Sequence, residues 1–362
     1  MSGEPSRGAP AFKAGFRPGG RKAVRLSTDD LVNAGPMADG TTFPLLVEPR
    51  VADLNPITWA GGRRELIDSW LLEHGAILLR GFAVDSADHF REVARTVTPN
   101  LLDYQERAAP RVEVAKNVFT STEYPADQAI PLHHEMSYSH NWPEKIWFFC
   151  LQPARQGGAT PIVDDRKLFP RIDPEIKRRF LDRKVMYVRN YGGGVDLPWQ
   201  EVFQTTDRAE VEAYCRKARM TCEWRGGDRL RTRGVRQVVA THPRTGDTVW
   251  FNHAHMFHVS NLAPEVRAAL LAEFDEDELP RNAFYGDGSP IDDAVLAEIR
   301  GLYRDLAVAF PWQQGDLLLL DNFLASHGRQ PFEGPRRIVV AMADLYTDPA
   351  HGADGDPARE SR

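Results

Sequence analysis

The sequence has little cysteine, no long apolar run and no excess of basic residues, and each absence excludes a class of protein. Its 362 residues include 3 cysteines, Cys150, Cys215 and Cys222, with no CxxC pair, which argues against a disulfide framework and predicts a reducing compartment, the cytoplasm. No apolar run approaches the roughly 20 residues that a membrane-spanning helix needs. No basic segment followed by an apolar stretch opens the chain, so secretion is not expected. The formal net charge of -6 predicts no basic surface for nucleic acid.

The composition is that of a folded globular protein. Hydrophobic residues make up 42% of the chain and charged residues 27%, with 18 Phe, 8 Trp and 9 Tyr, which excludes a largely disordered chain. Residues 1–25 are rich in Gly, Pro and Arg without a hydrophobic period, and 348–362 are similar, so we expect a flexible arm and a flexible tail. We expect a single domain over 26–347, since no linker divides it.

The hydrophobic pattern predicts helices early in the chain and many short strands later. Helical spacing predicts helices over 63–73, 85–97 and 174–182. Short apolar or aromatic runs predict strands over 76–82, 146–151, 183–191, 316–323 and 336–346, and a hairpin over 237–251. This order favours a mainly β protein with peripheral helices (α+β), a β-sandwich or jelly roll, over a doubly wound sheet.

A pair of metal-binding residue types stands two apart in the segment PLHHEMSYS. If the segment is extended, the side chains of His133 and Glu135 emerge on the same face. His327 is the best candidate for a third ligand, because it follows an apolar strand at a loop that contains Gly. Two His and one carboxylate occupy one face of an octahedral iron(II) and leave three positions open, as in non-haem oxygenases.

Two further segments strengthen this interpretation. In QGGATPIVD, Gly157 and Gly158 permit a tight backbone, and Thr160 offers a hydroxyl. Arg336 and Arg337 begin a strand that otherwise consists of apolar residues. An arginine that faces the interior of a barrel needs an anionic partner, because an unpaired buried charge is costly. A dicarboxylate ligand would supply one.

These segments resemble the iron(II)- and 2-oxoglutarate-dependent oxygenases of the taurine dioxygenase and clavaminate synthase-like superfamily, within it the hydroxylases of natural-product biosynthesis. The resemblance runs from about residue 75 to residue 344 and rests on LHHEMSYS, GGATPIVDD, FNHAHMFH and GDLLLLDNFLASHGRQPFEGPRRIVVAMAD. It implies a double-stranded β-helix (jelly-roll) core. It also implies a dioxygenase that uses iron(II), 2-oxoglutarate as co-substrate and O₂, and that releases succinate and CO₂.

The resemblance also implies roles for single residues. His133, Glu135 and His327 would ligate iron, and Thr160 would help to hold the 2-oxoglutarate carboxylate. An arginine nine or ten residues after the distal His would pair with the far carboxylate. Arg336 is preferred, since it alternates with the apolar residues of its strand, while Arg337 stays open because the register of the strand is not fixed by the sequence.

Departures from the family pattern narrow the activity. Halogenase variants replace the ligating carboxylate by Gly or Ala, so Glu135 argues against halogenation. Sulfonate-cleaving relatives place a second Arg four residues after the co-substrate Arg, where this chain has Val340 or Ala341, which argues against taurine-like substrates. The resemblance implies hydroxylation of an unactivated C–H bond in an amino acid or amino-acid-derived metabolite, free or tethered to a carrier protein. Desaturation, epoxidation or ring closure, and the oligomeric state, stay open.

Two other functions use the same residues. A non-catalytic jelly-roll binding protein would keep a metal or small ligand for structure and release no succinate. A metal hydrolase would use the same ligands with a bound water but has no need for Thr160 and Arg336.

Further side chains are weaker candidates. His134 is expected to point away from the metal, Asp321 and Asn322 to cap the turn before His327, and Arg329 to support the site, bind substrate or form a surface salt bridge. The candidates for the substrate pocket are Asn252, His255, Trp142, Tyr138, Trp224 and Arg225. The segment between Thr160 and His327 is long enough to hold insertions that shape this pocket.

Overall fold

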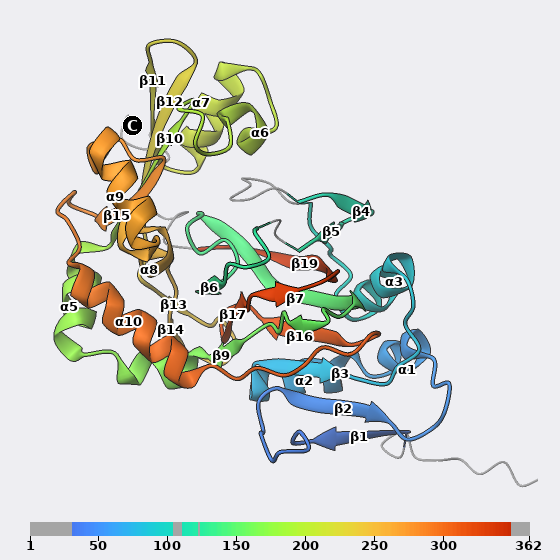
Figure 1. Ribbon diagram of the computed structural model, residues 1–362. Helices are drawn as coiled ribbons and strands as arrows, with labels where there is room; N and C mark the ends of the chain where they lie inside the picture. The colour runs from blue at the N-terminus through green and yellow to red at the C-terminus, as the bar shows by residue number, and fades with distance from the viewer. Residues whose placement is uncertain (1–30, 104–110, 122–123, 349–362) are drawn as a thin grey trace, which may run out of the picture.

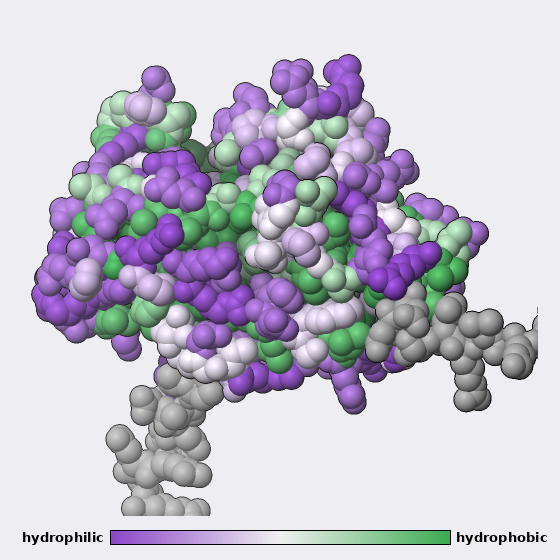
Figure 2. Space-filling view, turned by 90° about the horizontal axis from the view of Figure 1, so that it is seen from below, coloured by the Kyte–Doolittle hydropathy of each residue, from purple (hydrophilic) through white to green (hydrophobic). Residues whose placement is uncertain are grey.

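The computed structural model describes residues 31–103, 111–121 and 124–348. The expected flexible arm, 1–25, lies outside these residues, and so does the expected tail, 348–362, apart from Asp348. None of the helices in the described ranges is both long and apolar enough to cross a membrane. Figure 2 shows one face of the molecule, on which hydrophilic residues predominate and smaller hydrophobic patches lie between them.

The largest sheet has eight strands in the order β1-β2-β3-β16-β7-β19-β5-β4 (Figure 1). Their bounds are β1 Val32–Gly35, β2 Leu45–Pro49, β3 Ala76–Leu79, β4 Glu113–Ala115, β5 Val118–Thr120, β7 Asn141–Gln152, β16 Leu317–Asp321 and β19 Arg337–Thr347. The β2 and β3 strands pair in parallel, and the other neighbours pair antiparallel.

The four consecutive leucines of β16 explain why this strand is apolar without alternation. Leu317 and Leu319 pack in the core under the first three helices, while Leu318 and Leu320 pack in the core on the opposite face of the sheet. A strand buried on both faces needs apolar residues at every position. The helices on the first face are α1 Pro56–Gly61, α2 Arg64–His74 and α3 Ala87–Val97. The α2 helix ends at Gly75, whose φ of 75° is left-handed, and α3 begins after Ser86, whose side chain accepts a hydrogen bond from His89 N.

A smaller sheet covers the opposite face and carries most of the candidate site. It contains β6 Ile130–His133, β17 Ala325–Arg329 and β9 Ile162–Asp164, in the order β6-β17-β9. The short strands β8 Gln156–Gly157 and β18 Phe332–Glu333 form a separate two-stranded antiparallel sheet. The core between the sheets includes Ile162, Ala325, Ile338 and Val340, so the two layers form the expected jelly roll.

A further sheet and its helices fill most of the segment between Thr160 and His327. The sheet has the order β11-β12-β10-β15, and β11 and β12 project above the jelly roll beside α6 and α7 in Figure 1. The strands of this segment are β10 Val185–Tyr191, β11 Met220–Arg225, β12 Arg229–Arg236, β13 Val239–Thr241, β14 Thr248–Trp250 and β15 Arg281–Tyr285. The helices are α4 Asp165–Leu168, η2 Phe169–Arg171, α5 Pro174–Arg183, α6 Trp199–Phe203, α7 Arg208–Lys217, α8 Ala254–Phe257, η3 Val259–Asn261, α9 Pro264–Glu273 and α10 Asp293–Leu306.

Most of the expected elements are present, with shifted ends. The predicted helices correspond to α2, α3 and α5, and the hairpin expected over 237–251 is the β13–β14 pair. The strand expected over 146–151 is part of the longer β7, which pairs with both β16 and β19. The sequence did not predict the separate sheet of β10, β11, β12 and β15. The residues of a single strand do not specify which other strands it will pair with.

Candidate active site

Strand pairing brings two imidazoles to the same place. His133 ends β6 and lies directly opposite His327 of β17, and His327 also lies opposite Ile162 of β9. Opposite residues in an antiparallel pair project to the same face of the sheet. The ring centroids of His133 and His327 are 4.5 Å apart.

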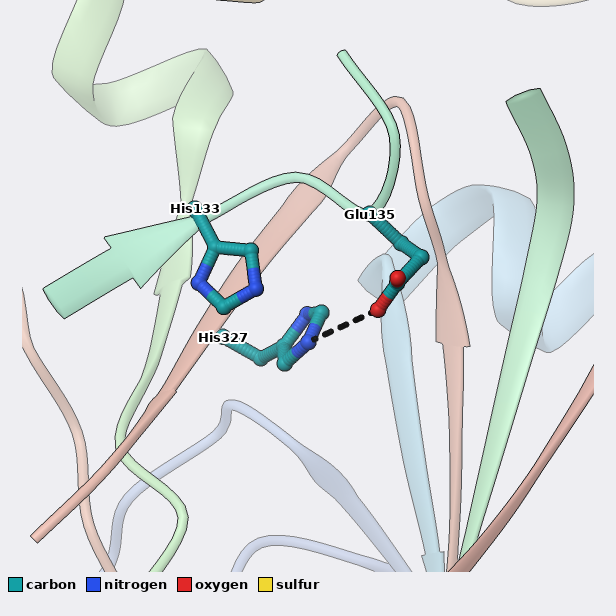
Figure 3. Close-up of side chains that lie close together, drawn as sticks. All are labelled: His133, Glu135 and His327. Carbon is teal, nitrogen blue, oxygen red and sulfur yellow. Dashed lines mark ion pairs between the residues drawn. The ribbon is translucent and has the colours of Figure 1, made fainter. Parts of the chain in front are cut away.

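Glu135 reaches the imidazoles from a turn. The extended conformation considered for His133 to Glu135 is wrong for this chain, because β6 ends at His133 and the following residues form turns. The carboxylate nevertheless points toward the imidazoles, with Glu135 Oε2 3.8 Å from His327 Nε2 (Figure 3). One potential ligand atom from each of the three residues lies within 4.8 Å of the other two. Within the described chain this trio has the composition of a two-His, one-carboxylate metal site.

The protonation of the imidazoles also suits a metal. His133 Nδ1 lies 2.8 Å from the carbonyl oxygen of Pro131, which only accepts hydrogen bonds, so Nδ1 carries the proton and the lone pair of Nε2 is available. Burial lowers the pKa of His133, and it lowers the pKa of His327 well below its ordinary value. Both rings are therefore neutral near pH 7, the form that binds metal ions.

Asn322 fixes the turn that carries Glu135. Its side-chain oxygen accepts a hydrogen bond from Glu135 N at 2.8 Å, and its side-chain nitrogen donates to the carbonyl oxygens of Glu135 at 3.0 Å and Pro143 at 2.8 Å. Asn322 is fully buried. The predicted turn cap next to it is Asp321, whose Oδ1 accepts from Phe323 N and Leu324 N. Asn322 instead orients the turn of a candidate ligand, a role that the sequence did not reveal.

Arg111 contacts the carboxylate itself. Its Nη2 donates to Glu135 Oε1 at 3.1 Å and to Oε2 at 2.9 Å, and both side chains are buried. Sequence reasoning missed Arg111, because it lies 24 residues before Glu135 in a segment without a motif.

His134 points away from the trio, as predicted. It is fully buried, its Nδ1 donates to the carbonyl oxygen of Asn322 at 2.7 Å, and its Nε2 lies 3.3 Å from Asp165 Oδ1. Asp165 Oδ2 in turn accepts from Ser326 N at 2.9 Å. Asp165 thereby contacts the residue after His133 and the residue before His327.

Thr160 and Arg336 line a pocket beside the two imidazoles. The pocket walls also include Phe148, Ile338 and Val340. Arg336 Nη2 lies 3.4 Å from Thr160 Oγ1, Arg336 Nε donates to the Gly158 carbonyl oxygen at 2.8 Å, and Trp312 Nε1 donates to Thr160 Oγ1 at 3.1 Å.

The charge of Arg336 suits an anionic ligand. Burial lowers its pKa to about 10, so the guanidinium is still protonated near pH 7. In the part of the chain that the structure describes, Arg336 forms no ion pair with a carboxylate, and its hydrogen bonds go to neutral oxygens. A half-buried cation of this kind favours an anionic partner, and the far carboxylate of 2-oxoglutarate would provide one.

Arg337 does not belong to this pocket. Its side chain is exposed, whereas Arg336, Ile338 and Val340 line the pocket. Because successive residues of a strand face opposite sides, Arg337 points away when its neighbours point in. The structure therefore places Arg336, and not Arg337, at the pocket.

The two glycines before Thr160 permit close backbone packing, as predicted. Gly157 and Gly158 have φ values of 69° and 71°, in the left-handed region. A Cβ on Gly157 would lie 2.3 Å from the Pro331 carbonyl oxygen, and a Cβ on Gly158 would lie 3.0 Å from Arg336 Cδ. A side chain at Gly158 would therefore displace the guanidinium.

The weaker candidates have mostly structural surroundings. His255 Nε2 donates to the Leu132 carbonyl oxygen at 2.7 Å and so supports β6, and Asn252 bonds to Val238 O and Ala254 N. Arg329 lines the pocket but donates to the carbonyl oxygens of Tyr124, Pro125 and Gln128, so it holds this loop. A surface salt bridge, one expectation for Arg329, is wrong because the residue is buried.

The aromatic candidates divide into core and remote residues. Trp142 packs against Phe251, Phe323 and Tyr346 in a buried cluster. Trp224 contacts Trp199, and Arg225 pairs with Glu223 and Glu278, all within or next to the four-stranded sheet.

One further histidine lies next to the trio. The ring centroid of His253 is 5.4 Å from that of His133 and 5.1 Å from that of Tyr138. Its Nδ1 contacts Ser137 Oγ. The sequence pointed to this segment but selected its neighbours Asn252 and His255.

Comparison with known proteins finds relatives that match most of the chain. The chain is 41% identical over 312 residues to the dapdiamide synthesis protein DdaC of Enterobacter agglomerans, covering 86% of this chain and 94% of the relative. It is 33% identical over 291 residues to a clavaminate synthase-like protein of Arabidopsis thaliana, covering 77% and 84%. The crystal structure of PvcB from Pseudomonas aeruginosa has a TM-score of 0.51 at 18% identity, covering 89% and 94%, and shares the fold.

Residues 44–342 match the family described as taurine catabolism dioxygenase TauD, TfdA family, which spans both layers of the jelly roll and the trio. This match agrees with the donor set and with the arginine-lined pocket. The chain therefore belongs to the TauD/TfdA family and is a 2-oxoglutarate-dependent dioxygenase that uses iron(II), 2-oxoglutarate and O₂.

Proposed function

We propose that this dioxygenase hydroxylates an unactivated C–H bond of an amino acid or amino-acid-derived metabolite, free or carrier-tethered, in natural-product biosynthesis. His133, Glu135 and His327 hold iron(II), and Thr160 and Arg336 hold the far carboxylate of 2-oxoglutarate. The observation that carries the proposal is the convergence of the three ligand atoms within 4.8 Å beside a half-buried arginine that forms no ion pair in the described chain. The similarity to a protein named for dapdiamide synthesis supports the biosynthetic assignment.

The residues of the site bind, orient and shield the reacting groups. Two neutral imidazoles and one carboxylate leave three positions of an octahedral ion open. Arg336 and Thr160 orient the co-substrate from its far end, so that its keto acid end faces the trio. Phe148, Ile338 and Val340 exclude water from the same pocket. Bound iron(II) supplies the coupling of 2-oxoglutarate decarboxylation to C–H oxidation.

The decisive test of the ligand set is spectroscopic. Anaerobic addition of iron(II) and 2-oxoglutarate should produce the weak visible charge-transfer band of a chelated keto acid, and His327→Ala should abolish it. His89→Ala is the matched control, since His89 lies on α3 and its imidazole is 3.5 Å from the exposed carboxylate of Asp85. A band that survives His327→Ala would show that the assignment of the ligands is wrong.

The substrate class is tested by succinate release. Amino acids and carrier-bound aminoacyl groups should be screened for substrates that stimulate it, and the mass of each product separates hydroxylation (+16) from desaturation or ring closure (−2). Desaturation and ring closure are the second candidates, because the same site serves both. Stimulation by neither group of compounds would contradict the substrate class.

We also propose that 26–347 form one domain and that the protein is cytoplasmic. The family match over 44–342 supports the first statement, and the three free cysteines support the second. Limited proteolysis should leave one resistant fragment within 26–347, and cell fractionation should place the protein with cytoplasmic markers.

A further inference from the structure

The carboxylate of Glu135 lacks the support that strand pairing gives to the two imidazoles. His133 and His327 are opposite residues of paired strands, whereas Glu135 lies in a turn after β6. Asn322 fixes the main chain of Glu135 but does not touch its carboxylate. The carboxylate therefore needs another group to fix its rotation.

Arg111 is that group. A single nitrogen, Nη2, lies 3.1 Å from Glu135 Oε1 and 2.9 Å from Oε2, and the Arg111 side chain is almost fully buried. In this position Glu135 Oε2 faces His327 Nε2 at 3.8 Å. Arg111 Nη2 is therefore nearest to the carboxylate oxygen that faces the second imidazole, and Arg111 lines the same pocket as the two imidazoles.

The backbone next to Arg111 is anchored to the main sheet. Val112 N donates to Thr120 Oγ1 at 2.9 Å, and Thr120 N donates to Val112 O at 2.8 Å. Thr120 ends β5, which pairs with β19, and the next residue, Ser121, donates to the Ile338 carbonyl oxygen. Arg111 is therefore tied to the strand that carries one wall of the co-substrate pocket.

A stabilising role alone does not explain this pair. Removing two charges from water costs several kcal/mol per ion, so a buried ion pair is weak evidence for stability. Hydrogen bonds to metal-ligating carboxylates, by contrast, orient the ligand and influence the affinity of the site for the metal. The position of the pair at the trio favours this second explanation.

We propose that Arg111 is a positioning residue that fixes the rotation of the Glu135 carboxylate at the iron site. Nη2 of Arg111 contacts both carboxylate oxygens, at 3.1 Å and 2.9 Å, and so limits the turning of the carboxylate about its last bond. This contact keeps Oε2 facing His327 Nε2. This inference rests on the ligand set of the proposed function.

Arg111→Met and Arg111→Lys test the inference, with Lys116→Met as the matched control. Lys116 is exposed and lies in the turn between β4 and β5, next to the same hairpin. The readouts are the iron(II) dissociation constant, the position and amplitude of the anaerobic iron(II)–2-oxoglutarate band, and the thermal unfolding of the metal-free protein. Arg111→Met should weaken iron(II) binding by about tenfold and alter the band, and Arg111→Lys should lie between it and the wild type. Lys116→Met should match the wild type.

The outcomes separate this inference from the proposed function. A wild-type protein without the band contradicts the proposed function itself. A wild-type band with Arg111→Met unchanged within twofold in affinity and in spectrum overturns the role of Arg111 alone. Tighter iron(II) binding by Arg111→Met also overturns it, because it would show that charge repulsion outweighs positioning. If Arg111→Met does not fold, Arg111→Lys decides by the same twofold criterion.

Discussion

The site has two halves that the protein supports in different ways. The imidazoles of His133 and His327 are aligned by the pairing of β6 with β17, and β9 continues the sheet on the other side. The carboxylate of Glu135 and the co-substrate pocket instead depend on buried polar side chains, namely Asn322, Arg111 and Arg336.

The difference shows where each half is vulnerable. Strand pairing distributes the support over many backbone hydrogen bonds, so a disturbance of the imidazoles should also cost global stability. A single buried side chain concentrates the support in a few bonds, so its loss should affect one function strongly. Four substitutions or conditions test this contrast, and they are given from the largest expected effect to the smallest.

Arg336→Met should raise the KM for 2-oxoglutarate by at least about 30-fold. Truncating one partner of a buried charge pair costs at least about 2 kcal/mol, and tenfold in affinity corresponds to about 1.4 kcal/mol. The iron(II) dissociation constant should change by less than about twofold, because Arg336 does not contact the trio. The adjacent and exposed Arg337→Met is the control and should keep the wild-type KM. Equal effects of the two substitutions would refute the alternation of the strand.

Asn322→Ala should weaken iron(II) binding by about tenfold and lower the free energy of unfolding by about 2–4 kcal/mol. It removes three side-chain hydrogen bonds and leaves buried backbone groups of Glu135 and Pro143 without partners. Asn190→Ala is the control, since Asn190 also makes three side-chain bonds, to Asp277, Leu279 and Arg231 in and around the four-stranded sheet. It should destabilise the fold but leave iron(II) binding unchanged, as metal titration and chemical unfolding can show.

Gly328→Ala should disturb the half of the site that contains His133 and His327. It should lower the free energy of unfolding by about 1–3 kcal/mol. A Cβ at Gly328 would lie 2.7 Å from the Ile130 carbonyl oxygen, on the strand that pairs with β17. Gly226→Ala is the control, because a Cβ there meets nothing within 4 Å. Urea unfolding measures both, and a stability equal to that of Gly226→Ala would contradict the close approach of the strands.

Acid should gradually lower the free energy of unfolding through a histidine that supports β6. Burial lowers the pKa of His255, which donates to the Leu132 carbonyl oxygen in β6, to about 3. Below the unfolded-state pKa of about 6.5 the unfolded chain binds a proton that the folded chain does not, so stability falls as the pH decreases toward 3. The contribution of His255 is on the order of 1 kcal/mol at pH 5.5. His255→Gln keeps a donor but does not titrate, so its stability should fall less between pH 7 and 5.5, and parallel pH profiles would contradict this origin.

Much of the site was predictable because its residue types are unusual in their setting. The HxE pair, the distal histidine and a strand that opens with arginine all stand out against apolar surroundings. The alternation of Arg336 with Ile338 and Val340 even separates Arg336 from Arg337, and the structure agrees. Arg111 carries no such signal, since an arginine in an irregular segment is typical of any surface.

The sequence by itself determined the composition of the jelly roll, the candidates for the donor set and the family of this dioxygenase, because residue type and periodicity are local properties that persist in the unfolded chain. Only the tertiary structure decided that Glu135 approaches from a turn, that Arg111 and Asn322 hold it, and that β10, β11, β12 and β15 form their own sheet. These features arise from contacts between segments far apart in the chain. Their formation depends on which buried polar groups find partners once the core has packed, and a local pattern does not encode that choice.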